Sequence, residues 1–274
     1  MKHIDDQVLE FYTSLPFNIY EDLSLAIENI KKFNLKNTYP FLEEDVKAAE
    51  TIIDVGCGGG WLANVLAYHF NKRVTGLDFN PVALEHAKKI SKILNNKNTY
   101  IKKNIFEYVS DEKFDLIISM GVLHHTKDCM KALDITCKMG KPGSKIYIGL
   151  YHKYGRKPFL EKFNRTQNLE EEDKFKLYKS MHPLKDEKHQ LSWFRDQVLH
   201  PHETQHVLEE VLEVFRKNNY KFIGTSINQF DNQESLVNIL NKEKKLYDYA
   251  FEKIKNNIYY PGFFIIGGEM INDQ

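Results

Sequence analysis

The sequence predicts a doubly wound α/β fold, in which helices cover both faces of a largely parallel sheet. Between residues 51 and 150, short apolar runs alternate with segments of helical periodicity, at the spacing of consecutive β-α-β units. The clearest run is 114–120, whose unbroken apolar character is typical of a central strand buried on both faces. At 274 residues, the chain is long enough for one such domain with additions.

The first 45 residues are expected to form a helical N-terminal flap. Leu23, Ala26, Ile27 and Ile30 recur at helical spacing, which indicates an amphipathic helix. The segment 11–20 differs, because its aromatic residues crowd around a proline. Two interpretations stay open for it: a packing element that covers the core, or a lid over a bound ligand.

A glycine-rich loop follows the first predicted strand, 51–55, and leads into a helix over 62–70. Glycines suit this turn because they accept positive φ angles and let a ligand lie against bare backbone amides. A dinucleotide-binding loop needs a further glycine three residues after its second one. Counting from Gly56 and Gly58, that position holds Trp61. The loop therefore favours a nucleotide-like cofactor other than a dinucleotide.

The next elements continue the alternation. A second strand over 72–78 ends in Asp78, at the place where a carboxylate can accept two hydrogen bonds from a ribose diol. Asn80 and Pro81 then predict a helix start, with a polar cap followed by a proline in the first turn. A third strand is expected over 100–105, the fourth over 114–120, a helix up to about residue 138, a turn over 141–144 and a fifth strand over 145–150.

Beyond residue 151 the pattern changes. From 156 to about 199 the chain is charged and broken by prolines, yet it holds scattered aromatic residues, which favour a helical insertion over disorder. After the insertion we expect a helix over 203–218, a strand over 221–227, a helix over 233–256 and a last strand over 261–270.

The composition excludes several classes of protein. Lys plus Arg equals Asp plus Glu at 38 each, so no global charge points to nucleic acid. Cys57, Cys129 and Cys137 lack C-x-x-C spacing, which argues against a disulfide scaffold and a cysteine-based zinc site. With neither a signal peptide nor an apolar stretch of membrane-spanning length, a soluble cytoplasmic protein is expected.

The ordered motifs together resemble the class I S-adenosylmethionine-dependent methyltransferases. They are Asp54-Val55-Gly56-Cys57-Gly58-Gly59-Gly60, Gly76-Leu77-Asp78-Phe79-Asn80, Phe114-Asp115-Leu116-Ile117, Leu123-His124-His125 and Lys141-Pro142-Gly143-Ser144. The sequence Leu123-His124-His125 is similar to the small-molecule, methyltransferase type 11/12-like branch. The resemblance implies a Rossmann-like seven-stranded sheet with an antiparallel last strand. Its parts would be the flap (1–45), a cofactor-binding half (46–153), a helical insertion or lid (154–202) and a C-terminal half (203–274).

The resemblance also implies S-adenosylmethionine as the cofactor and assigns residues to it. Asn104 stands where an aspartate is common, and its amide can still accept a hydrogen bond from the adenine amine. By this resemblance the loop is shaped by Asp54, Gly56, Gly58 and Gly60, and Asp78 meets the ribose hydroxyls. Phe79 flanks the adenine, and Asn104 and Ile105 lie at the edge of the adenine. Met120 lies near the methionine moiety.

Histidines and a tyrosine are the candidate catalytic groups, because an imidazole titrates in the range where a base is useful. The segment 202–206 formally matches the H-E-x-x-H zinc-protease helix, but the spacing to a third ligand is missing. Its histidines are open to three interpretations: a plain helix start, hydrogen-bonding groups that face an acceptor, or metal ligands; no metal is assigned. The candidates are His124, His125, Tyr151, His152, His200, His202 and His206. We expect His202→Ala and His206→Ala to lose turnover while S-adenosylmethionine still binds.

The expected reaction is methyl transfer by in-line displacement to a small polar or amphiphilic metabolite. The segment after the fourth strand lacks the D/N/S-P-P-Y pattern of amino-methylating DNA enzymes, and no cysteine follows a proline. Nucleic-acid substrates of those classes are therefore not expected. The alternatives are a tRNA or protein methyltransferase and an inactive cofactor-binding scaffold. The acceptor atom and the oligomeric state stay open.

Overall fold

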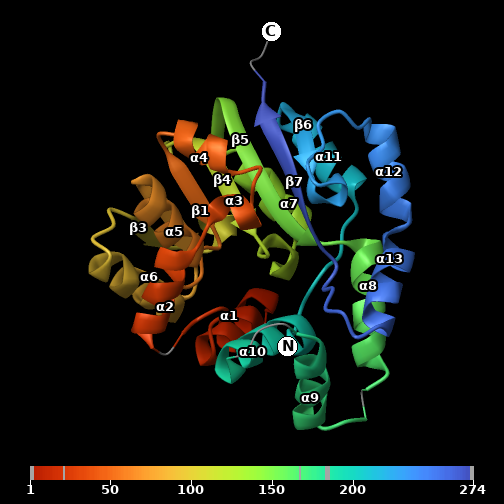
Figure 1. Cartoon of the computed structure of the whole chain (residues 1–274). Helices are drawn as coiled ribbons and strands as arrows, with labels where there is room; N and C mark the ends of the chain where they lie inside the picture. The colour runs from red at the N-terminus through yellow and green to blue at the C-terminus, as the bar shows by residue number, and fades with distance from the viewer. Residues whose placement is uncertain (1–2, 21, 167, 183–185, 272–274) are drawn as a thin grey trace.

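A seven-stranded sheet forms the centre of the computed structural model, which describes residues 3–20, 22–166, 168–182 and 186–271 (Figure 1). Its strand order is β3-β2-β1-β4-β5-β7-β6, and β7 runs antiparallel to both of its neighbours. The strands are β1 (Ile52–Val55), β2 (Val74–Asp78), β3 (Thr99–Lys102), β4 (Phe114–Met120), β5 (Gly140–Tyr151), β6 (Tyr220–Thr225) and β7 (Phe263–Met270). The predicted Rossmann-like fold with an antiparallel last strand is confirmed.

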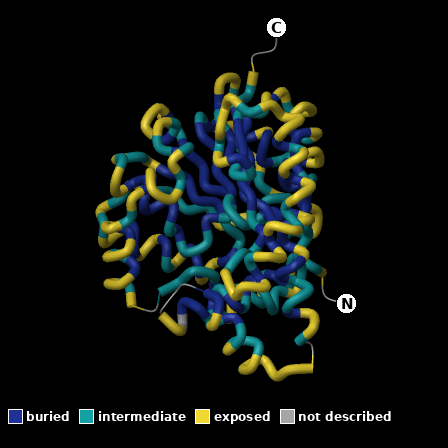
Figure 2. The backbone as a smooth tube through the Cα atoms, turned by 45° about the vertical axis from the view of Figure 1, so that its right-hand side comes forward, coloured by how far each residue is buried: buried dark blue, intermediate teal, exposed yellow. Residues whose placement is uncertain are grey.

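Helices cover both faces of the sheet, and apolar side chains fill the layers between them. Successive residues of β4 illustrate this, because neighbouring side chains of a strand point to opposite faces. Ile117 packs in one apolar cluster, and Leu116 and Ile118 pack in the other. Figure 2 shows the buried strands enclosed by helices whose outer sides are exposed. These helices are α5 (Trp61–Phe70), α6 (Pro81–Ile93), α7 (Cys129–Cys137), α11 (Leu208–Lys217) and α12 (Leu236–Lys244). The next helix, α13 (Leu246–Lys255), packs on the insertion described below.

The N-terminal segment supplies further helices before β1. Ala26 and Ile30 of the second of these pack against Val65 of α5 and Ile90 of α6, which anchors the segment to the sheet layer. The first helix, in contrast, lies below the carboxyl ends of the strands, beside α10 (Figure 1). The four helices are α1 (Ile4–Ser14), α2 (Leu23–Lys32), α3 (Leu35–Thr38) and α4 (Glu43–Ala48).

The segment after β5 is helical, as expected of the insertion. It forms α8 (Lys153–Asn164), α9 (Glu171–Met181) and α10 (Glu187–Phe194), and a π-helical turn, Arg195–Leu199, follows directly. These helices share an apolar cluster of their own, in which Phe159, Tyr178 and Phe194 are fully buried. Because α8 also packs along α13, the insertion is tied to the C-terminal part of the chain.

Several predicted boundaries were wrong. The expected turn 141–144 lies within β5, where Gly143 takes a φ of +82° and the pairing with β4 shifts register. The helix expected from 203 begins only at Leu208, because residues 203–207 run extended beside the end of β5, with a bridge between His152 and His206. The helix expected over 233–256 is two helices, α12 and α13, which meet at Lys245. The third strand ends at Lys102, before Asn104 caps a short 3-10 turn.

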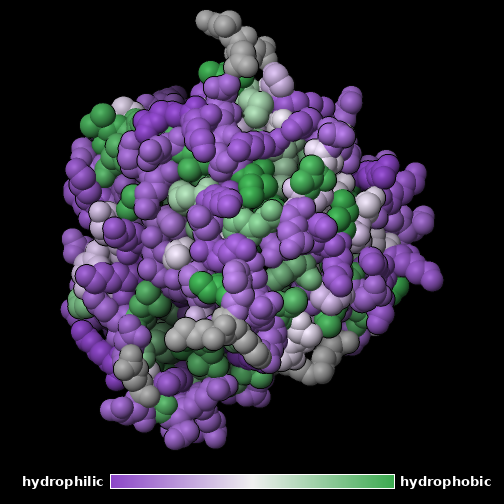
Figure 3. All heavy atoms as spheres, turned by 180° about the vertical axis from the view of Figure 1, so that it is seen from behind, coloured by the Kyte–Doolittle hydropathy of each residue, from purple (hydrophilic) through white to green (hydrophobic). Residues whose placement is uncertain are grey.

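Among the described residues, no helix has the length and apolar character needed to cross a bilayer. Seen from behind, the molecule is mostly hydrophilic, with hydrophobic residues scattered in small groups (Figure 3). Scattered surface apolar residues of this kind are normal for a globular protein and need no partner to explain them.

Candidate functional site

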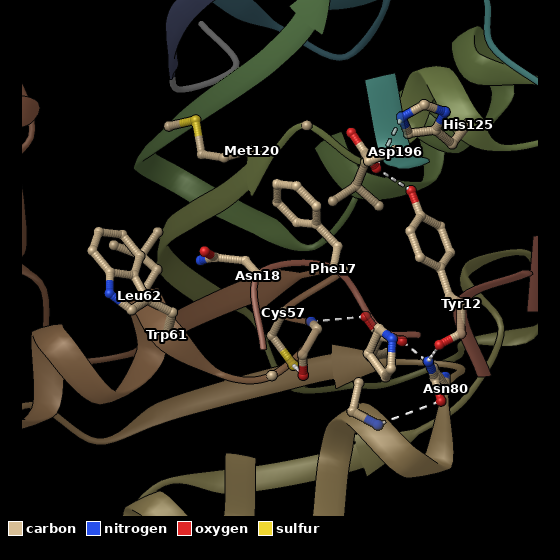
Figure 4. Close-up of a pocket in the computed structure, with 18 of the residues that line it drawn as sticks. Tyr12, Phe17, Asn18, Cys57, Trp61, Leu62, Asn80, Met120, His125 and Asp196 are labelled. Atoms are coloured by element: carbon tan, nitrogen blue, oxygen red, sulfur yellow. Dashed lines mark hydrogen bonds and ion pairs between the residues drawn. The ribbon is translucent and has the colours of Figure 1, made fainter. Parts of the chain in front are cut away.

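A cavity of about 670 Å³ lies at the carboxyl ends of β1, β2 and β4. The strand order reverses between β1 and β4, and open α/β sheets bind ligands in the crevice at such a reversal. Residues of α1, of the segment after it and of α10 line the side opposite the sheet, among them Tyr12, Phe17 and Trp193. Figure 4 shows Tyr12 and Phe17 pointing into the same space as residues of the glycine loop. The cavity is therefore built from both the sheet and the added helices.

The glycine loop, residues 56–60, connects β1 to α5 and forms one wall of the cavity. Gly56 and Gly60 take φ angles of +74° and +72°, a region that glycine enters without strain. A Cβ atom at Gly56 would lie 2.2 Å from the side chain of Val122, and one at Gly60 would lie 2.5 Å from Ala87. A Cβ at Gly58 would meet nothing within 4 Å. Two of the predicted glycines are thus required by packing, and the third exposes its backbone.

Asp78, at the end of β2, lines the cavity with its carboxylate already oriented. One oxygen accepts a hydrogen bond from the backbone N–H of Gly58 at 2.8 Å, and the other accepts one from Asn80, also at 2.8 Å. Each carboxylate oxygen keeps a further lone pair for a ligand hydroxyl. This geometry suits the predicted contact with a ribose.

Asp54, near the end of β1, is a second acid in the cavity wall and is 4% exposed. Burial, together with the negative charge of Asp78, raises the pKa of Asp54 to about 7. Within the described residues, neither carboxylate forms a salt bridge to a basic side chain. A ligand that carries positive charge would supply the missing partner. S-adenosylmethionine fits this requirement, because it has both an ammonium and a sulfonium centre.

The remaining predicted cofactor residues also line the cavity. Phe79 follows Asp78, and Met120 closes β4. Asn104 caps a 3-10 turn (Ile105–Glu107) with its side-chain oxygen, which accepts from the N–H of Phe106 at 3.0 Å. Its amide nitrogen donates to Asp5 of α1 at 3.1 Å. Asn104 therefore joins the N-terminal helix to the predicted adenine end of the cavity, with Ile105 beside it.

A polar cluster of Tyr12, His125, Tyr151 and Asp196, here called the acceptor-side cluster, lines another part of the cavity. One oxygen of Asp196, Oδ1, accepts the hydroxyl hydrogen of Tyr12 at 2.5 Å and lies 3.8 Å from Nε2 of His125. The other oxygen, Oδ2, accepts from Tyr151 at 3.4 Å. Burial raises the pKa of Asp196, whereas the hydrogen bond from Tyr12 and the charge of Arg156 act in the opposite direction.

The hydrogen bond of His125 to the main chain defines its tautomer. Its Nδ1 lies 3.0 Å from the carbonyl oxygen of His202, so Nδ1 carries the hydrogen. Burial lowers the pKa of His125 to about 4, which keeps the ring neutral and leaves a lone pair on Nε2. Nε2 is buried and makes no hydrogen bond to any described residue. His125 thus presents an unused hydrogen-bond acceptor toward Asp196 and the cavity (Figure 4).

The other candidate histidines occupy different places. His124 lines the cavity beside His125, and neither of its ring nitrogens is hydrogen-bonded to a described residue. Burial lowers the pKa of His124 well below its usual range. The ring of His200 stacks on His125 at a centroid distance of 3.8 Å, behind the cavity wall. The structure therefore brings three of the predicted histidines together, two of them at the cavity.

Three candidates lie outside the cavity lining and hold the backbone in place. His152 caps α8 by accepting from the N–H groups of Tyr154 and Gly155, and its Nε2 lies 2.8 Å from Glu243. The ring of His202 bonds to the carbonyl oxygen of Thr126. The ring of His206 bonds to Thr204 and Glu210. Because 202–206 is extended, its histidines do not share a helix face. No three His, Cys, Asp or Glu side chains within the described ranges are grouped to hold a metal.

Several cavity residues were missed by the sequence analysis, because they carry no motif. Asp196 lies in a π-helical turn, and Tyr12 lies in the aromatic segment for which a lid was one interpretation. Arg156, which was missed as well, does not line the cavity; it is fully buried behind Tyr151 and stacks on its ring, 3.8 Å from the centroid. It also forms an ion pair with Glu203 at 2.8 Å. The other missed residues of the cavity wall include Asn18, His189, Trp193 and Gln197.

Comparison with known proteins gives a consistent result. A family model described as a methyltransferase domain matches residues 46–191, just over half of the chain. A ubiquinone biosynthesis O-methyltransferase of Vibrio vulnificus (strain YJ016) is 28% identical over 135 residues, which cover 48% of this chain and 57% of that protein. The chain therefore spans a little over half the length of this curated relative.

Solved structures share the fold. A Rickettsia typhi protein, PKMT2, has a TM-score of 0.62 at 17% identity, covering 86% of this chain and 53% of that one. Magnesium protoporphyrin IX methyltransferase from Synechocystis PCC 6803 with bound SAH has a TM-score of 0.53 at 14% identity, covering 97% of this chain and 93% of that one. At these identities the likeness concerns the fold alone.

Proposed function

The chain belongs to the methyltransferase family that uses S-adenosylmethionine, and we propose that it transfers the methyl group to a small polar or amphiphilic acceptor held inside the cavity. The observation that supports this proposal best is the enclosure of the site. All predicted cofactor residues but Gly60 line one cavity with the acceptor-side cluster, and residues of α1 and α10 line its other side. A reacting group would be surrounded by protein.

The size of the cavity supports a small acceptor. Pockets of roughly 300–1,000 Å³ are typical for cofactors and drug-sized ligands. At about 670 Å³, this cavity has room for the cofactor and a modest acceptor molecule. A tRNA or a folded protein would have to insert a single nucleotide or side chain past α1. The formal net charge is zero, so the chain has no overall positive charge to attract a tRNA.

When bound, S-adenosylmethionine supplies an electrophilic methyl group on a positively charged sulfur. The chain's own residues then have two tasks: to align the acceptor in line with that methyl group, and to exclude water. Asp54 and Asp78 offer negative charge at the cofactor end. At the acceptor end, the neutral His125 can receive a proton at Nε2 from an acceptor that must lose one. Asp196 and Tyr12 position that acceptor by hydrogen bonding.

The proposal is tested by following a labelled methyl group. The purified protein is incubated with methyl-labelled S-adenosylmethionine and, separately, with a small-metabolite extract, with total tRNA and with total protein. We expect label in the small-molecule fraction. Label in tRNA or protein alone, with a steep loss at increasing salt for tRNA, would contradict the proposal. Tight cofactor binding without label in any fraction would support the alternative of an inactive scaffold.

A further inference from the structure

We propose that the acceptor is a primary amine, which the Nε2 atom of His125 and the carboxylate of Asp196 hold by its two N–H bonds. This inference rests on the proposed methyl transfer and specifies the acceptor of the same cavity. Its basis is that Nε2 of His125 has no hydrogen-bond donor among the described residues and lies 3.8 Å from Oδ1 of Asp196, an oxygen that also accepts from Tyr12 (Figure 4).

The other hydrogen bonds of His125 and Asp196 determine that both groups act as hydrogen-bond acceptors. The carbonyl oxygen of His202 takes the hydrogen on Nδ1 of His125, so Nε2 can only accept. Asp196 receives the hydroxyl hydrogens of Tyr12 and Tyr151, which favours its carboxylate form, with lone pairs left over. His125 is 4% exposed and Asp196 is 7% exposed, so water does not freely supply the donor that Nε2 of His125 lacks. A buried acceptor without a donor is costly, and the ligand is the natural source of one.

The distance between the two acceptors suits one nitrogen atom. Nε2 of His125 lies 3.8 Å from Oδ1 of Asp196. An atom placed at about 2.9 Å from both would see them at an angle of roughly 80°. Two N–H bonds of a single amine can meet that angle with slightly bent hydrogen bonds. A hydroxyl has one hydrogen, so it satisfies one acceptor and turns a lone pair toward the other.

Nucleophilicity separates a primary amine from other groups that have two N–H bonds. In an amide or a guanidinium group the nitrogen lone pair is delocalised, whereas a neutral amine keeps it available. With both N–H bonds directed to His125 and Asp196, the lone pair points away from the two acceptors and into the cavity. The same contacts that bind the amine therefore orient its reactive electrons.

Methyl transfer requires the amine in its neutral form, so an amine that arrives as an ammonium ion first releases one proton to solvent. The nitrogen lone pair forms a bond to the methyl carbon while the carbon–sulfur bond breaks, and the electrons of that bond stay on sulfur. The product is a methylated ammonium ion, and the other product is an uncharged thioether. Positive charge thus develops on nitrogen beside the carboxylate of Asp196, which stabilises it. The aromatic side chains of Tyr12 and Trp193, which line the cavity, favour a cationic centre as well.

The experiment compares matched amines and alcohols without any turnover. The full chain is first loaded with S-adenosylhomocysteine, which has no methyl group to transfer. Calorimetry then measures the Kd of benzylamine against benzyl alcohol, and of phenethylamine against phenethyl alcohol. We expect each amine to bind at least about tenfold more tightly than its alcohol, because the single hydrogen of an alcohol can reach Nε2 of His125 or Oδ1 of Asp196 but not both.

Two variants test whether Asp196 is the source of this preference. Asp196→Asn keeps the size of the side chain but removes its charge, and we expect the amine-to-alcohol ratio to fall to about one. Asp173→Asn, an identical change on the exposed side of α9, serves as the control and should keep the wild-type ratio. The wild-type comparison stands by itself if Asp196→Asn does not fold.

The outcomes separate the inference from the proposed function. Equal or tighter binding of the alcohols, no binding of either amine, or an unchanged ratio in folded Asp196→Asn would overturn the amine assignment. If S-adenosylhomocysteine binds normally in those cases, the methyl-transfer proposal survives. Failure of the wild-type chain to bind S-adenosylhomocysteine would overturn both.

Discussion

The ionisation of Asp54 makes the affinity for S-adenosylmethionine depend on pH. In the free protein, burial and the neighbouring Asp78 raise the pKa of Asp54 to about 7, so near neutral pH about half of the molecules carry this carboxyl in its protonated form. A positively charged ligand favours the ionised form and lowers that pKa. Binding therefore releases a proton, and affinity rises as the pH rises through about 7.

The size of the effect follows from the pKa. At about pH 5.5 only about 3% of Asp54 is ionised in the free protein, whereas at about pH 7.5 most of it is. If Asp54 is fully ionised in the complex, the Kd at about pH 5.5 should be about 25-fold higher than the Kd at about pH 7.5. The stability of the free protein changes in the opposite direction, because the contribution of Asp54 to it falls as the pH rises. A raised pKa stabilises the folded state below the unfolded-state pKa of about 3.9, and that contribution is lost as the pH rises through about 7.

Calorimetric titration with S-adenosylmethionine, in buffers of different ionisation enthalpy, measures both the Kd and the protons released. The side chain of Asp54→Asn cannot titrate. We therefore expect its Kd at about pH 7.5 to be about tenfold or more above that of the wild type, and to lose the pH dependence that Asp54 causes. The exposed Asp111→Asn is the matched control and should behave as wild type. A flat pH profile for the wild type, without proton release, would refute the assignment of positive charge to this end of the cavity.

Three further substitutions have clear expected outcomes. Gly60→Ala should lower the free energy of unfolding by about 2–5 kcal/mol, because the new Cβ strains a positive-φ backbone and clashes with α6. Gly143→Ala has the same backbone strain but open space around the Cβ, so it should lower this free energy by only about 1–2 kcal/mol. Urea unfolding measures both values. Arg156→Met should cost about 3–5 kcal/mol in the same assay, because it leaves the partly buried Glu203 without its ion-pair partner. Adding Glu203→Gln should recover part of this loss, and no recovery would contradict the ion-pair explanation. His206→Ala should keep its turnover and lose stability, contrary to the expectation from sequence, because the ring lies outside the cavity; lost turnover in a folded variant would show otherwise.

The cofactor end of the site was largely predictable because its residues follow one another along the chain. Gly56 and Gly60 are spaced by the turn from β1 to α5, and Asp78 ends the next strand. Such positions depend on local geometry, in which the carboxyl ends of neighbouring parallel strands meet at one edge. The predicted cofactor residues that end strands or form the loop line the cavity, except Gly60, which is buried behind it, and their contacts with the cofactor stay a prediction.

The boundaries of elements were less predictable where tertiary contacts override local preference. The segment 202–206 carries a helix-like motif, yet it is extended because Glu203 pairs with Arg156 and the backbone of His206 bridges to β5. The N–H of His206 bonds to the carbonyl oxygen of Tyr151 at 2.9 Å. Neither partner is visible in a window of neighbouring residues, so periodicity alone could not find this strand-like path.

The sequence by itself determined the sheet, the glycine loop and the family, because these depend on hydrophobic periodicity and on residues close together in the chain. Only the tertiary structure decided the acceptor side. Tyr12, His125 and Asp196 come from α1, from the turn after β4 and from the end of the insertion, and they meet only because α1 and α10 fold beneath the sheet. Long-range packing of this kind leaves no spacing rule in the sequence, since each side chain is placed by the core of its own element.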